Sequence, residues 1–371
     1  MMIFFKIRFL APALLIVAAL IAVSPLGRAA DLPAPAQNQA TLDPRWAQIE
    51  PLLSAVARRG AAALRAHHPQ EAVKALKPVA GPADPSAELM LAHALWATAT
   101  PGQEDQALRE GFAWAARSAA QGFAVAQAEL AWDFEIGGRV PRDYQLAARL
   151  YRQAADQGYA SGKRGLVRMT SSLGKWADAP PAPAEKAGEE ALLRLDFSAA
   201  LANFTQAANA QSPSAMFALA MLKDGGFGGP RDLAATEDWL TRAARLGYPP
   251  AAFALAERGS GKLTPEQLDW LKKAAEAGFT GAIFSRGLYT NAGVNGFAKD
   301  EAGGWELIKK AAALDDTFAK VAAARVYFEG VRGAVAQDRP MAYRLAREAY
   351  QDGNNLAGEE LSQFQRAEGA H

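Results

Sequence analysis

Apolar residues recur along most of the chain at spacings of three and four residues, which predicts short amphipathic helices. One stripe consists of Ala126, Leu130 and Phe134, widened by Ala131 and Trp132. A second stripe follows after a short polar interval and consists of Leu146, Ala147, Leu150, Tyr151, Ala154 and Ala155. The two stripes predict a pair of helices that pack against each other as a hairpin.

Turn residues mark the ends of these two helices. Gly137-Gly138 predicts the end of the first helix, because glycine takes the left-handed conformation of a helix stop. Pro141 lies in the loop, and Asp143 can cap the second helix. Gly158 predicts the end of that helix. Residues 126–159 therefore form one predicted helical hairpin.

The same pattern returns at a constant offset of 89 residues. At this offset Pro141-Arg142-Asp143 coincides with Pro230-Arg231-Asp232, and Gly158-Tyr159 coincides with Gly247-Tyr248. Further copies begin near Ala252, Ala282 and Ala319, and a weaker copy begins near Ala87. Asp315 stands where the closing glycine of its copy is expected. A single hairpin cannot bury its apolar face, so these copies are expected to stack.

This pattern resembles the Sel1-like repeat, a relative of the tetratricopeptide repeat. Its motif is roughly A-x-x-x-L-G-x-x-Y-x-x-G, a loop, D-x-x-x-A, an aromatic residue and A-A-x-x-G. The resemblance covers most of residues 87–353. The sequence departs from the motif at some positions, such as Lys223 or Thr290 where an aromatic residue is usual. The number of repeats therefore stays open. It implies an all-α fold, a right-handed α-solenoid of stacked helical hairpins.

The resemblance also implies a function. Relatives in this family act as adaptors in multiprotein complexes, including bacterial envelope assembly, exopolysaccharide export and signalling. The chain is therefore expected to bind a protein or peptide partner on its concave surface, near Trp132, Phe217 and Phe284. Core packing is the alternative interpretation of each of these three residues. Two other functions stay open: a polysaccharide- or peptidoglycan-binding module, and a hydrolase with its site in the groove.

The N-terminus reads as a targeting segment. Residues 1–30 combine a basic start at Lys6 and Arg8 with the apolar run Phe9–Val23 and small residues near Ala29. These features predict a signal peptide and a periplasmic or secreted protein without a membrane span after cleavage. An uncleaved N-terminus that anchors the protein in the inner membrane is the alternative. Residues 31–45 read as a flexible leader.

Prolines divide the remaining chain. Residues 46–176 form an N-terminal helical-repeat segment, and residues 177–187 form a proline-rich interruption. Residues 188–371 form a C-terminal repeat array that ends in a capping helix over residues 356–366. In this helix Glu359, Glu360, Gln363 and Arg366 are expected on the outer face. The interruption marks a soft domain boundary, and a continuous superhelix is the alternative.

Composition excludes several kinds of chemistry. The formal charge of +1 gives no general field for nucleic acid, and without cysteine the chain has neither disulfides nor a thiol nucleophile. The four histidines lack metal-ligand spacing. Gly259-Ser260-Gly261-Lys262 departs from a phosphate loop because Leu263 replaces the required serine or threonine; a turn with Thr264 as helix cap is expected. We therefore expect no metal, cofactor or nucleic acid, and no enzyme.

The acidic residues fall into two groups. Asp143, Asp232, Asp300 and Asp338 recur in register, which predicts helix caps rather than a catalytic pair. Isolated acids such as Asp133 and Glu135 could form a site between helices, and their spacing alone does not decide this.

Overall fold

The computed structural model describes residues 44–99, 104–137, 140–258, 262–331 and 335–369. The predicted signal peptide and nearly all of the predicted leader lie outside these residues. The α-helices are α2 (Pro44–Ile49), α3 (Ala55–Arg65), α4 (Pro69–Leu76), α5 (Pro85–Ala97), α6 (Glu104–Ala120), α7 (Ala124–Ile136), α8 (Tyr144–Asp156), α9 (Ala160–Leu173), α10 (Pro183–Leu193), α11 (Phe197–Asn209), α12 (Pro213–Gly225), α13 (Leu233–Arg245), α14 (Pro249–Ala256), α15 (Pro265–Glu276), α16 (Thr280–Ala292), α17 (Glu301–Ala313), α18 (Thr317–Glu329), α19 (Arg339–Gln351) and α20 (Asn355–Gly369). Two 3₁₀ turns are η1 (Glu50–Leu52) and η2 (Gly174–Trp176).

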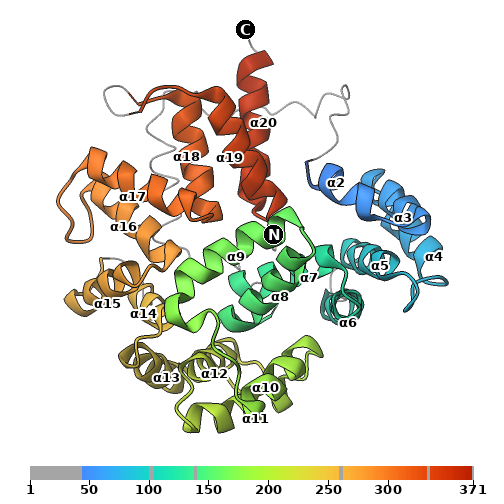
Figure 1. Cartoon of the computed structure of the whole chain (residues 1–371), viewed down its shortest axis with the longest axis horizontal. Coiled ribbons are helices and arrows are strands. Elements are labelled where there is room, and N and C mark those ends of the chain that lie inside the picture. Colours follow the sequence, from blue (N-terminus) through green and yellow to red (C-terminus); the bar gives the residue numbers. More distant parts are fainter. Residues whose placement is uncertain (1–43, 100–103, 138–139, 259–261, 332–334, 370–371) are drawn as a thin grey trace.

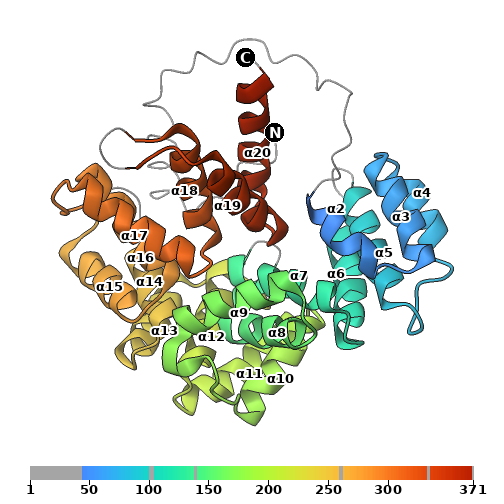
Figure 2. The ribbon, with the colours of Figure 1, turned by 45° about the horizontal axis from the view of Figure 1, so that its top comes forward.

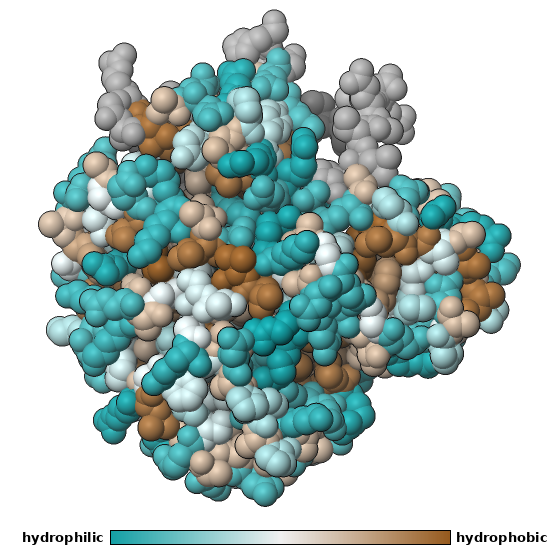
Figure 3. Space-filling view, in the orientation of Figure 1, coloured by the Kyte–Doolittle hydropathy of each residue, from teal (hydrophilic) through white to brown (hydrophobic). Residues whose placement is uncertain are grey.

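Consecutive helices pack as hairpins that stack along a curved path, as in α7–α8, α12–α13 and α16–α17 (Figure 1). The described residues contain no β-strand; Val331 and Val335 form one isolated bridge. The prediction of an all-α solenoid of stacked helical hairpins is therefore confirmed. Figure 3 shows hydrophobic residues at the surface near the middle of one face and over the N-terminal helices, surrounded by hydrophilic ones.

The recurrent aspartates are helix caps, as their register predicts. The carboxylates of Asp143, Asp232, Asp300 and Asp338 each accept a hydrogen bond from the backbone N–H three residues later, at 2.9, 3.0, 2.9 and 3.0 Å. Thr264 caps α15 in a reciprocal pair with Gln267, which confirms its predicted role, although residues 259–261 lie outside the described residues. Caps of this kind satisfy N–H groups that the helix itself leaves unpaired.

One non-glycine residue confirms that the turn between repeats requires a left-handed backbone. Gly158, Gly247 and Gly278 follow the second helices of three hairpins, with φ of 85°, 83° and 94°. Asp315 occupies the equivalent place after α17 and has a φ of 63°. Aspartate tolerates this region better than most residues with a side chain.

Helix α9 lies across the inside of the C-terminal array, between the N-terminal hairpins and α14–α18 (Figures 1 and 2). We call Ser161, Arg164, Arg168, Ser171 and Trp176 the α9 stripe; the last lies in η2. Their side chains donate hydrogen bonds to Gln351 O (3.3 Å), Asp352 Oδ2 (2.8 Å), Asp315 O (2.8 Å), Gly278 O (3.1 Å) and Gly247 O (3.2 Å), respectively. These acceptors lie in the turns that follow α19, α17, α15 and α13. One segment thus joins four consecutive turns of the array.

The first described helix also contacts the last hairpin. On α2, Arg45 donates to Tyr350 O at 2.7 Å and to Asn355 Oδ1 at 2.8 Å. Gln48 donates to Ser161 of the α9 stripe at 2.9 Å. The N-terminal helices therefore meet both the end of the array and the helix that crosses it.

The proline-rich interruption is short. Residues 177–182 form no helix, and Pro183 begins α10 as its first residue, where its missing N–H costs nothing. The division into an N-terminal and a C-terminal segment at this point stays a prediction.

The prediction of a polar outer face on the last helix is wrong at Glu360. Glu360 on α20 is buried, and its carboxylate accepts hydrogen bonds from Nε and Nη2 of Arg325, at 2.6 to 3.2 Å. The half-buried guanidinium of Arg325 on α18 needs a counter-charge, so Glu360 turns inward.

Arg168 tests the role of the α9 stripe. It is fully buried, and its Nε and Nη2 donate to the two carboxylate oxygens of Glu135 at 2.6 and 2.7 Å. Arg168→Met leaves Glu135 buried without a counter-charge, so the free energy of unfolding should fall by about 3–5 kcal/mol. Urea denaturation measures this change.

Arg152→Met is the matched control, because its ion pair with Asp178 is exposed and should contribute less than about 1 kcal/mol. The double variant Arg168→Met/Glu135→Leu should recover much of the loss, since it removes both charges. Equal losses for Arg168→Met and Arg152→Met would contradict a structural role for the stripe.

Candidate functional site

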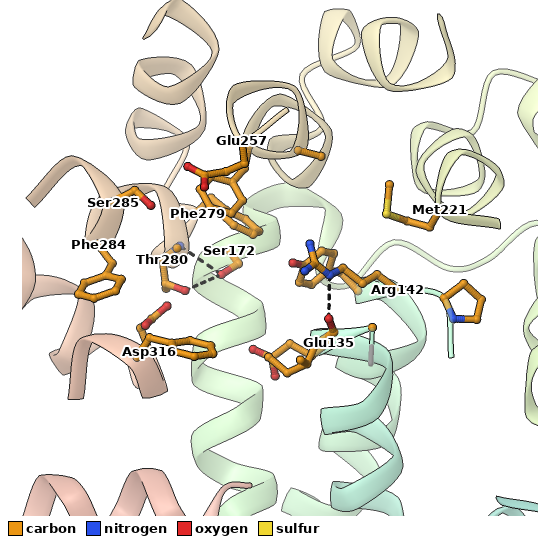
Figure 4. A pocket seen from close by; sticks show the side chains of 18 of the residues that line it. Glu135, Arg142, Ser172, Met221, Glu257, Phe279, Thr280, Phe284, Ser285 and Asp316 are labelled. Carbon is orange, nitrogen blue, oxygen red and sulfur yellow. Dashed lines mark hydrogen bonds between the residues drawn. The ribbon is translucent and has the colours of Figure 1, made fainter. Parts of the chain in front are cut away.

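A pocket of about 220 Å³ lies on the inner surface, where α9 faces α12, α14, α16 and α18. We call it the inner pocket. Its aromatic lining consists of Phe227, Phe253, Phe279, Phe284 and Phe318, together with Tyr144. Figure 4 shows Phe284, Ser285 and Asp316 on one side of Ser172, and Arg142 and Met221 on the other. Most of its walls are therefore apolar, with a few polar groups among them.

The aromatic wall depends on close packing between adjacent hairpins. The ring of Phe279 lies 4.8 Å from that of Phe253 and 5.5 Å, edge to face, from that of Tyr144. Gly281 at the start of α16 makes room for these rings, since a Cβ there would lie 3.1 Å from Phe279 and 3.4 Å from Phe253. Offset and edge-to-face ring pairs of this kind hold their positions well.

Acidic residues recur at the ends of the inner helices. Glu135 on α7 and Asp224 on α12 are 89 residues apart and occupy the same place in their repeats. Glu135 is held by Arg168, and Asp224 lies 3.4 Å from Arg258 and 3.8 Å from Arg231. Both carboxylates therefore line the pocket with a counter-charge beside them.

Glu257, directly after α14, differs from these two acids. Glu257 is only 7% exposed, and its Oε1 is buried without a hydrogen-bond partner. Burial raises the pKa of Glu257 to about 7, and the charge of Arg142 offsets only part of this effect. Near neutral pH this carboxyl can therefore hold a proton, or lose it to a partner that stabilises the anion.

Asp316 is the fourth acid of the inner pocket. Its carboxylate accepts a hydrogen bond from Ala319 N at 2.9 Å and so caps α18. Burial raises the pKa of Asp316, while this backbone hydrogen bond and the charge of Arg168 lower it. The helix N-terminus already supplies positive potential to this group.

A second cavity, of about 550 Å³, lies where α2, α5 and α7 meet the turn between α19 and α20. We call it the aromatic cavity. Its tryptophan and tyrosine rings belong to Trp46, Trp96, Trp132, Tyr151, Tyr159 and Tyr350. Its polar side chains include Gln48, Glu129, Ser161 and Asn355. His93 also lines it and lies 2.7 Å from Glu129, nitrogen to oxygen. Aromatic rings beside amide and carboxylate groups can hold a polar ligand that has apolar faces.

The three residues expected to bind a partner lie in different environments. Phe284 lines the inner pocket, and Trp132 lines the aromatic cavity. Phe217 is 1% exposed and packs against Tyr144 and Tyr248. This environment matches core packing, the alternative interpretation of this residue. A role in partner binding stays a prediction for these residues.

The sequence pattern did not point to Glu257. It follows a run of apolar residues in α14, the shortest of the inner helices, and the adjacent Arg258 pairs with Asp224 of the preceding repeat. Its neighbours come from α16 and from the loop before α8, which only the folded arrangement brings together.

Two further observations concern the described residues alone. No cluster of three histidine, aspartate or glutamate side chains has a metal-binding arrangement there. Within the same ranges, none of the helices combines the length and the apolar character needed to cross a membrane.

Comparisons with known proteins show where the repeats lie along the chain. The sequence profile of the Sel1 repeat matches residues 124–159, 213–248, 268–279 and 319–354. No curated protein matches the chain. Among solved structures, a Sel1 repeat protein from Oxalobacter formigenes is similar, with 20% identity, a TM-score of 0.42, and coverage of 94% of this chain and 99% of that chain. A protective antigen with an SLR fold from uropathogenic Escherichia coli strains has 21% identity, a TM-score of 0.39, and coverage of 79% and 67%.

The pKa of Glu257 predicts a pH-dependent effect of Glu257→Gln on stability. The folded-state pKa of about 7 lies above the ordinary value of 4.5, so the folded state binds the proton more tightly than the unfolded state. The contribution of Glu257 is fully present below pH 4.5 and is lost as pH rises to about 7. Glutamine has no such loss. We therefore compare the free energies of unfolding of Glu257→Gln and the wild type at two pH values. From pH 4.5 to pH 8 the difference should shift in favour of the variant by on the order of 2–3 kcal/mol.

Urea unfolding at a series of pH values measures this difference. Glu276→Gln is the control, because this glutamate is exposed at the end of α15 and the difference should stay flat. A Glu257→Gln difference that does not change between pH 5 and pH 8 would contradict the raised pKa.

Proposed function

We propose, on the premise that the chain belongs to the Sel1-repeat family, that it is a scaffold whose inner pocket binds a protein or peptide partner. Stacked helical hairpins present long curved surfaces, which suit extended segments of other proteins. The proposal requires no catalysis, and the expectation that the protein is not an enzyme stays a prediction.

The single observation that carries the proposal is the inner pocket. Apolar, well-formed pockets with a few convergent polar groups are common binding sites. Here Phe253 on α14, Phe279 directly before α16 and Phe284 on α16 line the pocket together with Glu257, whose buried Oε1 has no hydrogen-bond partner. A pocket formed by several repeats can hold side chains of one extended segment while the rest of that segment follows the array.

We also propose that the protein works in the bacterial periplasm, in envelope assembly, exopolysaccharide export or signalling. Support comes from the basic and apolar pattern of residues 1–30. Mass spectrometry of the N-terminus tests it. A mature chain that begins close to residue 31 is expected, and a mass that retains Met1 would contradict cleavage.

The aromatic cavity favours a second candidate function, the binding of polysaccharide or peptidoglycan strands. Three tryptophans and three tyrosines line it beside amide, hydroxyl and carboxylate groups. Sugar rings present apolar faces and hydroxyl edges, which match such a lining.

Photo-crosslinking in cells tests the first proposal. A photoreactive amino acid is placed at Met221 or Val321, which line the inner pocket, or at Leu233 or Leu246, which are exposed on the second helix α13 and at its end. The expected result is a reproducible protein adduct from the two pocket positions only. Adducts from all four positions alike would contradict binding in the pocket.

Phe284→Ala adds a second readout. It removes one wall of the pocket and should lower the yield of the adduct from Val321 by roughly thirtyfold, because it deletes about 2 kcal/mol of apolar contact. Phe364→Ala, a buried phenylalanine of α20 outside the pocket, is the control for stability and should keep the yield. Recovery of glycan without protein, across several crosslinkers, would favour the second candidate.

A further inference from the structure

The charges around the inner pocket are unequal. Four carboxylates line it, those of Glu135, Asp224, Glu257 and Asp316, against the guanidinium groups of Arg142 and Arg258. Asp224 uses Arg258, and Glu135 uses Arg168 from outside the lining. Asp316 lies at the N-terminus of α18 and accepts its backbone N–H.

Among these charged groups, Glu257 and Arg142 remain after the pairings. The buried Oε1 of Glu257 has no hydrogen-bond donor. The charge of Arg142 lowers the pKa of Glu257 against the larger effect of burial, and Nε of that arginine donates to Ile136 O at 2.9 Å. A buried carboxylate without a partner is costly, so a bound group that brings a positive charge gains more from this site than a neutral one does.

The walls beside Glu257 suit the stem of a long basic side chain. The pocket is lined by Phe253, Phe279 and Phe284, and Figure 4 shows Phe279 next to Glu257 with Ser285 nearby. Lysine and arginine cover apolar surface with their methylene groups and carry the charge at the tip. The cation can also lie over an aromatic ring.

We propose that the inner pocket selects a partner segment in which a lysine or arginine lies beside apolar side chains, with Glu257 as the counter-charge. This proposal rests on the proposed function and specifies which side chains the bound segment of the partner carries. The competing possibility is that Glu257 stays protonated and donates a hydrogen bond to a neutral acceptor. A neutral segment would then bind equally well.

Peptide display distinguishes these possibilities. A random library of 12-residue peptides is selected on the full mature protein at pH 8, and in parallel on Glu257→Gln, Glu276→Gln and Phe284→Ala. The wild type and the exposed control Glu276→Gln should enrich peptides with a lysine or arginine next to an aromatic or aliphatic residue. Glu257→Gln should lose the basic residue from its consensus and keep the apolar ones. Selection on Phe284→Ala should not enrich the peptides that the wild type selects.

The strongest peptide then enters a double-mutant cycle by calorimetry. Replacement of its basic residue by norleucine should weaken binding to the wild type about tenfold or more, and binding to Glu257→Gln less than about threefold. Wild-type affinity should also rise about tenfold from pH 6 to pH 8 as Glu257 loses its proton, and Glu257→Gln should lack this rise. The other charged groups that face the pocket, Glu135, Asp224, Asp316, Arg142 and Arg258, are present in both proteins and cancel in this comparison.

Each outcome decides a different claim. Peptides that depend on Phe284 but show no basic preference, or an equal preference on Glu257→Gln, would overturn the role of Glu257 and leave the proposed function standing. The absence of any peptide that depends on Phe284 would overturn both. Circular dichroism of each variant shows whether it is folded.

Discussion

The hydrogen bonds between the α9 stripe and the turns of the C-terminal array are the interaction on which the rest of the structure depends. A solenoid of hairpins contacts only its neighbours, so its inner face would otherwise stay open. Here α9 and η2 reach four consecutive turns, from Gln351 and Asp352 back to Gly247. The inner face is thereby covered in part, and the inner pocket is the space that this helix leaves against α12 to α18. The residues that stabilise the array also shape its candidate site.

Burial of charge gives this arrangement its chemical character. The crossing helix brings Arg164 and Arg168 into the interior, and each is matched by a carboxylate, Asp352 and Glu135, respectively. Buried pairs of this kind contribute little net stability, but loss of one partner is costly. Glu257 differs from them because its buried Oε1 has no hydrogen-bond partner and the charge of Arg142 offsets only part of the effect of burial. A protein that keeps an uncompensated carboxyl in an apolar pocket is suited to a ligand that completes the pair.

Local features of the fold followed from the sequence, and long-range ones did not. The caps at Asp143 and Asp232 and the left-handed turn at Asp315 depend on a few adjacent residues, so the repeat pattern sufficed to predict them. The crossing of α9 depends on contacts between residues 71 to 190 positions apart, such as Arg168 with Asp315. Glu360 pairs with Arg325 across 35 positions, and its helical spacing gave no sign of this. Glu257 and Asp224 are both acids at the ends of inner helices, but the fold brings Arg231 and Arg258 to Asp224 and leaves Oε1 of Glu257 without a hydrogen bond.

The most direct test of the account is the titration of Glu257 itself, followed by carbon-13 NMR of the glutamate side-chain carboxyls, with Glu257→Gln to assign the signal. The proposed role of Glu257 requires a buried carboxyl whose charge Arg142 offsets only in part, and it predicts a midpoint near pH 7. A midpoint near the ordinary value of 4.5 would contradict it, because the carboxyl would then be hydrated or paired, and the inner pocket would have no uncompensated charge to offer a partner.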